Sequence, residues 1–442
     1  MKDYDLIILG GGAAGLAAAQ AAQGGGRRIA LVEPGLAGGT GFHAGPQPLL
    51  HILKQRKMPP AWSELQQAAA GWAGRLARRW KDELLRGGVD WYEGRGALHD
   101  SGCVEVQGET GGNILKGRAV LIATGSGDRP SPVIPFDESR ILPGDRLARQ
   151  TNLPESLLLV TEGWGPCLEW ACLLRQLDRK VFLCDPSQDP LSGRGPEWTG
   201  ALEQVLRSLK IKLLLRKPLQ SIYKSGEEVR VTLEGGVQFT VQQLIFIGPR
   251  RVSTETLNRG GIFPKCGPEG EILVNEQMET TVPGVFAAGS VTGHGRDWMR
   301  SQEEGRVAGA NAVGKKRAFH PERVPRLLAL KPPFGAIGCS AEEAHHFGFR
   351  GIRGRGGGDE ERRPDPGSGT WCQLVVDRAS REIIGGETVG EESESLLWAL
   401  QTAMRKGLKV RDLCRPLTCP GSGLEVLQEA ARDCLRGLEE AQ

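Results

Sequence analysis

A glycine-rich stretch near the start of the chain has the residue types and spacing needed to bind a phosphate. The stretch Gly10-Gly11-Gly12-Ala13-Ala14-Gly15 lies between an apolar run and an alanine-rich run. Gly10 permits a tight turn, Gly12 lets backbone amides approach a pyrophosphate, and Gly15 allows a helix to pack closely on a strand. Glu33 follows at the distance expected of an acid that binds ribose hydroxyls. These residues predict a dinucleotide-binding site.

The elements around this stretch form one half of a doubly wound fold. We expect a strand over 5–9, a helix over 13–23 and a strand over 28–33, and a second unit of this type with strands over 157–160 and 181–184 around a helix over 166–177. Further expected elements are helices over 49–57, 61–86 and 301–313 and strands over 120–124, 244–247 and 285–288. The predicted class is α/β, with two Rossmann-like domains.

The pattern changes after residue 317, where a C-terminal α+β domain is expected. Residues 350–370 are rich in Gly, Arg, Asp and Pro, which predicts a mobile surface loop. Strands are expected over 371–377 and 383–389, and helices over 394–406 and 424–435. We therefore divide the chain into a first part of one dinucleotide-binding domain at 1–150, a second nucleotide-binding-like domain at 151–245, the second part of the first domain at 246–320 and a C-terminal domain at 321–442.

Composition excludes several classes of protein. The 56 basic and 53 acidic residues are interspersed and give a net charge of only +3, which argues against a nucleic-acid partner. No uncharged apolar run approaches the ~20 residues that span a bilayer. Ten scattered cysteines suit reduced thiols, so we expect a cytoplasmic protein. His345 and His346 are neighbours that cannot both face one metal ion, and no metal site is predicted.

Further motifs occur in a set order along the chain. They are Gly38-Gly39-Thr40, Ala123-Thr124-Gly125-Ser126, Gly248-Pro249-Arg250-Arg251, Thr281 to Gly289, and Leu374-Val375-Val376-Asp377. Together they resemble the pyridine nucleotide-disulfide oxidoreductases, which include dihydrolipoamide dehydrogenase, glutathione reductase and mercuric reductase. The resemblance implies FAD in the first site and a homodimer formed through the C-terminal domain. The cofactor-binding residues it implies are Gly10, Gly12, Ala13, Ala14, Gly15, Glu33, Gly39, Thr40, Ala123, Thr124, Gly125, Gly289 and Ser290.

The sequence departs from this family where the family carries its redox-active disulfide. The family reads Gly-Gly-Thr-Cys, four residues and a second Cys, whereas Gly41 and Pro46 stand at the two cysteine positions here. Neither residue forms a thiolate, so dithiol chemistry at this position is excluded. Leu49 and Leu50 replace the family's lysine, while its glutamate partner persists as Glu169. Lys54, one turn beyond Leu50, is the candidate to replace that lysine.

The second nucleotide fingerprint is also altered. Counting back from Asp185 places Glu162, Trp164 and Cys167 at the three glycine positions, where an indole and a carboxylate oppose a pyrophosphate. The alternative register uses Gly163 and Gly165, with Gly248 nearby in the fold. NAD(P)H binding and a structural remnant of the βαβ unit both remain open, and Asp185 would favour NADH by repelling a 2′-phosphate.

Three other positions carry weaker signals. The flavin motif ends in Gly289-Ser290 rather than Gly-Asp, and serine still offers one hydrogen bond. The family's C-terminal His-Pro loop has no histidine here but carries Cys414 and Cys419, either a relocated dithiol or two unlinked thiols. His43 lies in the loop where the family has its cysteines. Two interpretations of it remain open, a proton donor near the flavin and an ordinary hydrogen-bonded residue.

Three functions follow from these residues. The first is an FAD-dependent oxidoreductase that passes electrons from NAD(P)H through flavin to a non-disulfide acceptor such as a quinone, with His43 and Glu169 as catalytic candidates. The second is a degenerate, non-catalytic or regulatory flavoprotein. The third is a thiol-disulfide oxidoreductase that uses Cys414 and Cys419.

Overall fold

The structure is a computed structural model of the chain and describes residues 2–440 with short gaps. The gaps are 101, 109–110, 130–133, 138, 162–164, 188–193, 255–256, 258–262, 360–362, 368 and 416. The chain divides into two compact units. Unit 1 holds 1–160, 219–232 and 236–319, and unit 2 holds 161–218, 233–235 and 320–442. The four-part division made from the sequence stays a prediction.

The main sheet of unit 1 confirms the first doubly wound half. Its order is β3-β2-β1-β6-β5-β4, with β17 paired to β6. The strands are β1 (Lys2–Leu9), β2 (Ile29–Glu33), β3 (Val89–Glu93), β4 (Arg95–Leu98), β5 (Cys103–Gly108), β6 (Gly111–Ile122) and β17 (Val285–Ala287). Alternate residues of β1 point to opposite faces, so Leu6 and Ile8 belong to one core cluster and Ile7 and Leu9 to another.

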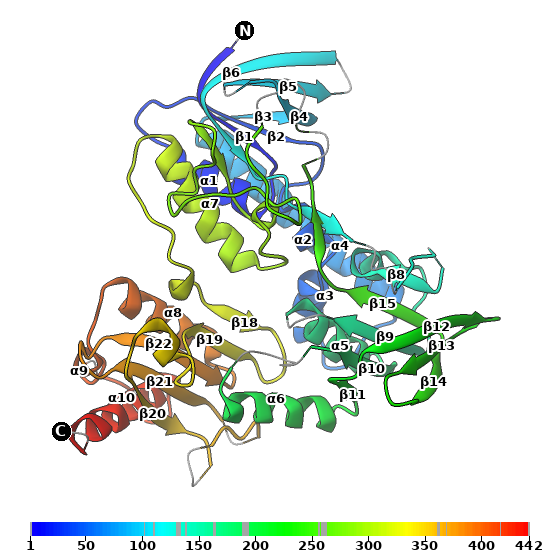
Figure 1. Cartoon of the computed structure of the whole chain (residues 1–442), viewed down its shortest axis with the longest axis vertical. Helices are drawn as coiled ribbons and strands as arrows, with labels where there is room; N and C mark the ends of the chain where they lie inside the picture. The colour runs from blue at the N-terminus through cyan, green and yellow to red at the C-terminus, as the bar shows by residue number, and fades with distance from the viewer. Residues whose placement is uncertain are drawn as a thin grey trace. The chain divides into compact units, whose positions relative to one another are not determined.

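Two small-residue helices cover one face of this sheet. Helices α1 (Ala13–Ala22) and α7 (Trp298–Ala312) run beside each other in Figure 1. A Cβ added at Gly305 would lie 2.0 Å from the Ala14 carbonyl oxygen, and one at Gly309 2.3 Å from that of Ala18. Glycine at both positions therefore sets how closely α7 approaches α1. The other helices of unit 1 are α2 (Gly39–His43), α3 (Gln47–Lys54) and α4 (Trp62–Arg86).

The second nucleotide unit contributes to a five-stranded sheet of order β11-β10-β9-β15-β8. Its strands are β8 (Ile141–Pro143), β9 (Ser156–Thr161), β10 (Lys180–Asp185), β11 (Lys212–Leu215) and β15 (Gln243–Ile247), and its helices are α5 (Pro166–Gln176) and α6 (Pro196–Ser208). Smaller elements are β7 (Ser126–Asp128), β12 (Leu219–Ser225), β13 (Glu228–Leu233), β14 (Gln238–Val241), β16 (Arg250–Val252) and the turns η1 (Gly144–Arg149) and η2 (Ser290–Thr292).

The C-terminal part is an antiparallel sheet of order β18-β19-β22-β21-β20. Its elements are β18 (Arg326–Leu328), β19 (Phe334–Gly338), β20 (Gly351–Gly357), β21 (Trp371–Asp377), β22 (Ile383–Val389), α8 (Ser393–Arg405), α9 (Val410–Leu413) and α10 (Gly423–Glu440), with turns η3 (Pro321–Arg323) and η4 (Ala344–Phe347). The two strands expected over 371–377 and 383–389 are confirmed with the same bounds. The predicted class, α/β with an α+β C-terminal part, is confirmed.

The surface loop predicted over 350–370 is wrong for its first part, because β20 occupies Gly351–Gly357. Close packing against a neighbouring helix, rather than a need for flexibility, explains the glycines of this strand. A Cβ at Gly354 would lie 2.2 Å from the carbonyl oxygen of Ala430 in α10, and one at Gly356 2.0 Å from that of Val426. Glycine-rich composition here marks a strand that lies directly against a helix.

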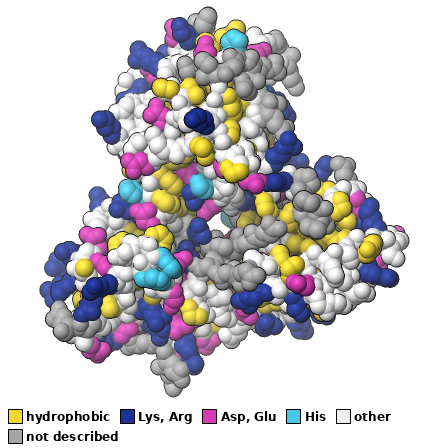
Figure 2. Space-filling view, viewed as in Figure 1, with side chains coloured by type: hydrophobic (Ala, Val, Ile, Leu, Met, Phe, Trp, Pro, Cys, Tyr) yellow, Lys and Arg dark blue, Asp and Glu magenta, His cyan; other side chains and the backbone are white. Residues whose placement is uncertain are grey.

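Charged side chains are spread over the surface. Lysine and arginine alternate with aspartate and glutamate on the face shown in Figure 2, without a large patch of one sign. Among the helices of the described residues, none combines the length and the apolar character needed to cross a membrane.

Candidate functional site

The glycine turn between β1 and α1 has the geometry expected of a dinucleotide site. Gly10 has a positive φ of 111°, and a Cβ there would lie 2.3 Å from the carbonyl oxygen of Ala123. A Cβ at Gly15 would lie 1.8 Å from the carbonyl oxygen of Gly10. No atom lies within 4 Å of a Cβ built at Gly12. The protein itself therefore requires glycine at 10 and 15, whereas Gly12 borders open space.

Glu33 is fixed beside this turn. One carboxylate oxygen accepts a hydrogen bond from the Gly11 amide at 2.6 Å and the other accepts one from the Gly35 amide at 2.8 Å. The side chain is buried, and the Trp91 ring edge and Glu33 both lie close to Gly11. Each carboxylate oxygen has a second lone pair, so Glu33 can still accept bonds from ribose hydroxyls.

The Gly39-Thr40 motif is brought to the same turn. The Gly38 amide donates to the Gly11 carbonyl at 2.8 Å, and Gly38 pairs with Gly12 in a short parallel bridge. Gly39 has a φ of 64°, and a Cβ there would lie 3.1 Å from the Cα of Gly12. Thr40 follows in the first turn of α2. The backbone of this motif therefore lies against the phosphate-binding turn.

The two remaining motifs converge on the same end of the sheet. The Ala123 amide donates to the Leu9 carbonyl at 2.8 Å. A Cβ at Gly125 would lie 3.6 Å from the Ser290 hydroxyl, and one at Gly289 would lie 2.9 Å from the Cβ of Ala14. The Thr124 hydroxyl donates to the Ser253 carbonyl at 2.8 Å. The predicted cofactor residues, far apart in sequence, thus surround one cradle in unit 1.

A buried carboxylate holds the Gly289 loop. Glu304, inside α7, is fully buried and accepts hydrogen bonds from the Gly289 amide at 2.8 Å and from Arg300 at 2.8 Å. Burial raises the pKa of Glu304, against the lowering effect of Arg300. Burial likewise lowers the pKa of the adjacent His294 to about 4, with the charge of Arg300 as the second cause. His294 is therefore neutral at physiological pH.

The segment that departs from the family is well defined. Gly41, in α2, is exposed, and no atom lies within 4 Å of a Cβ built there. Pro46 is the buried N-cap of α3, and Leu49 and Leu50 are buried inside that helix. The Ala37 carbonyl accepts a 2.9 Å hydrogen bond from Nε2 of His43, so that nitrogen carries a proton. None of the ten cysteines forms a disulfide within the described part of the chain.

Aromatic rings surround this segment, which the sequence analysis missed. We call Phe42, Trp72, Trp80 and Trp298 the aromatic cluster. The Phe42 ring centroid lies 5.7 Å from Trp72, 5.1 Å from Trp80 and 5.7 Å from Trp298, and Trp80 stacks on Trp298 at 5.9 Å. Trp72 and Trp80 are eight residues apart and share a face of α4, which the sequence could have indicated. No local pattern points to Trp298.

The second fingerprint is only partly within the described residues. Glu162, Gly163 and Trp164 lie outside them. Gly165 has a φ of 117° and caps α5. Asp185 is fully buried, and its carboxylate accepts hydrogen bonds from the Ser187 amide at 3.0 Å and hydroxyl at 2.6 Å. A Cβ at Gly248 would lie 2.1 Å from the Phe246 ring, so Gly248 has a packing role independent of any nucleotide.

The structure describes the surroundings of each of the other catalytic candidates. Glu169 in α5 is buried and accepts a 2.9 Å hydrogen bond from the Ala329 amide. Lys54 is exposed at the end of α3. Cys419 is exposed, whereas Cys414 is half-buried, and burial raises the pKa of its thiol. A raised thiol pKa lowers the fraction of reactive thiolate.

A buried group of four charges joins β7, β16 and η1 in unit 1. Arg250 contacts Asp128 and Asp145 at 3.1 Å, and Arg296 contacts the same two carboxylates at 2.6 Å. Arg250 also donates to the Ser126 hydroxyl at 2.8 Å. The four side chains are between 6% and 18% exposed, and their charges cancel. Burial raises the pKa of Asp128, and the neighbouring negative charge of Asp145 raises it further.

We expect Arg250→Met to destabilise unit 1 by about 3 kcal/mol, because it leaves two buried carboxylates facing one guanidinium. The measurement is chemical denaturation followed by circular dichroism. Arg118→Met is the matched control, since Arg118 is 86% exposed and contacts Asp5 at 3.4 Å. An exposed pair contributes at most about 1 kcal/mol. Equal shifts in the two variants would contradict a stabilising role for the buried group.

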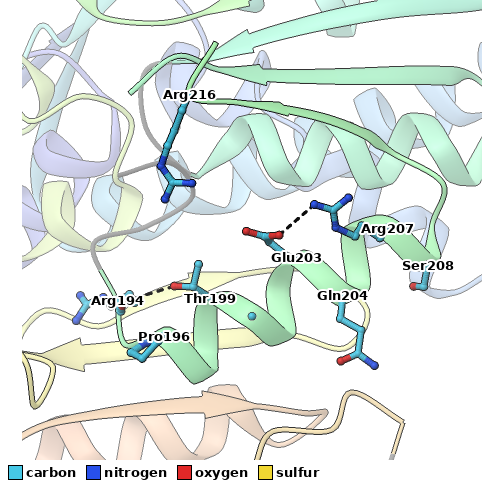
Figure 3. Close-up of a pocket in the computed structure, with 9 residues that line it drawn as sticks. Arg194, Pro196, Thr199, Glu203, Gln204, Arg207, Ser208 and Arg216 are labelled. Carbon is cyan, nitrogen blue, oxygen red and sulfur yellow. Dashed lines mark hydrogen bonds and ion pairs between the residues drawn. The ribbon is translucent and has the colours of Figure 1, made fainter. Parts of the chain in front are cut away.

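A hollow of about 900 Å³ lies along α6 in unit 2. Arg194, Glu203, Arg207 and Arg216 line it, and Glu203 pairs with Arg207 at 3.3 Å (Figure 3). No predicted site residue within the described ranges lines this hollow. The residues that line it all belong to unit 2, whereas the glycine turn belongs to unit 1.

Known proteins match this chain over nearly its full length. A dihydrolipoyl dehydrogenase from Chlamydia muridarum is 26% identical over 97% of this chain and 96% of its own. A mercuric reductase from Staphylococcus aureus is 24% identical over 93% and 79%, and a soluble pyridine nucleotide transhydrogenase from a Marinomonas species is 28% identical over 77% and 78%.

Solved structures show the same fold. LpdA from Mycobacterium tuberculosis superposes with a TM-score of 0.86 at 20% identity, covering 98% of this chain and 99% of that one. The flavoprotein disulfide reductase RclA from Escherichia coli, in a Cu(II) complex, has a TM-score of 0.81 at 20% identity over 98% and 99%.

Family models agree with these matches. Residues 4–305 match the model of the pyridine nucleotide-disulphide oxidoreductases, and residues 324–430 match the dimerisation domain of the same family. The match covers both the cradle and the altered segment at Gly41 and Pro46. The chain therefore belongs to the pyridine nucleotide-disulphide oxidoreductase family.

Proposed function

We propose that the chain is an FAD-dependent oxidoreductase that passes electrons from NAD(P)H to an acceptor other than a disulfide, such as a quinone. One observation carries the proposal: the cradle of unit 1 keeps its glycine turn and Glu33, whereas Gly41 and Pro46 remove the thiols beside it. A protein with a retained flavin cradle and no disulfide there must pass its electrons to something else.

The residues of the cradle fit the ADP half of FAD. Gly12 borders open space at the N-terminus of α1, where backbone amides and the helix dipole stabilise a pyrophosphate. Glu33 would accept bonds from the ribose hydroxyls, and Ser290 offers one hydroxyl in place of the family's carboxylate. Bound FAD would supply a ring that takes two electrons from a nicotinamide and passes them on. Gly41 has no side chain, so it would place no sulfur atom beside that ring.

Three further expectations belong to this proposal. Asp185 favours NADH over NADPH, because its buried carboxylate would repel a 2′-phosphate. We expect a homodimer formed through 324–430, where Trp398 is 71% exposed and Leu417 fully exposed. We also expect the protein to work in the cytoplasm.

Anaerobic titration tests the proposal. The purified protein is expected to be yellow, and one equivalent of NADH should bleach its visible absorbance, with NADPH acting more weakly. Bleaching followed by re-oxidation with menadione would support an oxidoreductase. Bound flavin that stays oxidised under NADH and NADPH would instead identify the non-catalytic flavoprotein.

Thiol chemistry through Cys414 and Cys419 is distinguished by one variant. If the two thiols form a relocated dithiol, Cys419→Ser should lose activity on a disulfide substrate while keeping its flavin. If they are unlinked, as their different burial suggests, the variant should match the wild type.

A further inference from the structure

We infer that the acceptor is a neutral, planar aromatic molecule that stacks on the aromatic cluster formed by Phe42, Trp72, Trp80 and Trp298. This inference rests on the proposed function and deepens it, because it assigns the acceptor to particular side chains. The first observation is that two residues of the aromatic cluster lie on helices that contact the cradle. Phe42 is in α2, whose first residue Gly39 lies against Gly12, and Trp298 is the first residue of α7, whose buried Glu304 holds the Gly289 loop.

The second support is exposure. Phe42 is buried at the centre of the cluster, whereas the three tryptophans are only partly buried. An aromatic group that served the core alone would be covered, since burying a large ring is strongly favourable. Partly exposed indoles grouped around one ring present apolar area to a ligand.

The third support is the polar edge of the cluster. The His51 ring stacks on Trp72 with centroids 4.0 Å apart, and its Nε2 lies 2.8 Å from the Gln55 amide nitrogen. The amide nitrogen has no acceptor capacity, so Gln55 donates and the Nε2 of His51 accepts. Imidazole and amide groups at the rim of an apolar surface suit carbonyl oxygens of a ligand.

The reaction balances with the groups named. A quinone takes up two electrons and two protons and becomes a hydroquinone. NADH supplies the two electrons and one proton equivalent as hydride, by way of the flavin, and solvent supplies the second proton. NAD⁺ is released. No thiol is oxidised or reduced in this scheme.

Binding is tested first, without turnover. Menadione is titrated into the oxidised, flavin-loaded protein without NADH, and quenching of tryptophan emission is followed. Trp72→Ala and Trp298→Ala are expected to weaken the saturable quenching about tenfold, a change typical of losing a stacking partner. Trp62→Phe, on the same helix as Trp72, is the control, since Trp62 only donates to the Gln150 carbonyl at 2.8 Å. Saturable quenching that is equal in all variants would overturn the inference.

Turnover separates this inference from the proposed function. Each variant is assayed with NADH and either menadione or ferricyanide, an anion that cannot stack. We expect Trp298→Ala to raise KM for menadione about tenfold more than it raises KM for ferricyanide. Trp298→Phe, which keeps a ring, should recover most of the loss. No reduction of either acceptor by the wild type would end the proposed function, whereas ferricyanide turnover with an unchanged menadione KM would end only the inference.

Discussion

Gly12→Ala is expected to leave the fold intact and to remove the flavin. The backbone at Gly12 has a φ of −76°, which alanine adopts without strain, and no protein atom lies within 4 Å of the added methyl group. The stability of the cofactor-free protein should therefore change by less than about 1 kcal/mol. The methyl group instead occupies space that a pyrophosphate needs on the helix N-terminus. We expect at least a tenfold fall in bound flavin, measured as the ratio of visible to ultraviolet absorbance after incubation with FAD.

The matched comparison is Gly15→Ala, which fails for a different reason. Its methyl group would lie 1.8 Å from the Gly10 carbonyl oxygen, so the turn itself must open. This variant should lose both flavin and thermal stability. Full flavin occupancy in Gly12→Ala would show that the cofactor does not rest on this turn.

Much of the cradle could be predicted because its chemistry is local. The turn, the helix and Glu33 follow one another within a short stretch. The spacing of the glycines indicates where the backbone must turn tightly and where the helix packs closely on the strand. Even so, the structure gives Gly11 a role the sequence did not suggest, because its amide binds Glu33 and its Cα faces Trp91. The same local logic placed the strands at 371–377 and 383–389.

Features that depend on distant contacts could not be predicted. The glycines of β20 resemble a flexible loop until α10 is seen to lie against Gly354 and Gly356. Arg250 and Arg296 contact Asp128 and Asp145 only after four segments are brought together. The aromatic cluster likewise combines α2, α4 and α7. The composition and the residue spacing do not predict contacts between segments that lie so far apart in the sequence.

The double variant Gly41→Cys/Pro46→Cys is expected to restore dithiol chemistry. The position at 41 is open to a side chain, and Pro46 has a φ of −76° and a ψ of −16°, which cysteine also adopts. Gly45, between them, approaches Gly41 closely, since a Cβ there would lie 2.5 Å from the Gly41 carbonyl oxygen. The segment is thus already folded back as a short helical turn, a geometry in which two cysteines five residues apart can pair.

Reduced flavin would donate two electrons to this disulfide and yield two thiols. We expect thiol titration to show two additional thiols only after reduction, together with a new long-wavelength absorbance when NADH is added. Menadione reduction should begin only after a lag of two electrons per protomer, because the disulfide is reduced once and no disulfide substrate is present to reoxidise the two thiols. Gly41→Cys alone supplies a thiol without a partner and should show neither the paired thiols nor the lag. If the double variant keeps two free thiols under oxidising conditions, Gly41 and Pro46 do not occupy the places of the family's cysteines, and the absence of sulfur beside the flavin would no longer explain the choice of acceptor.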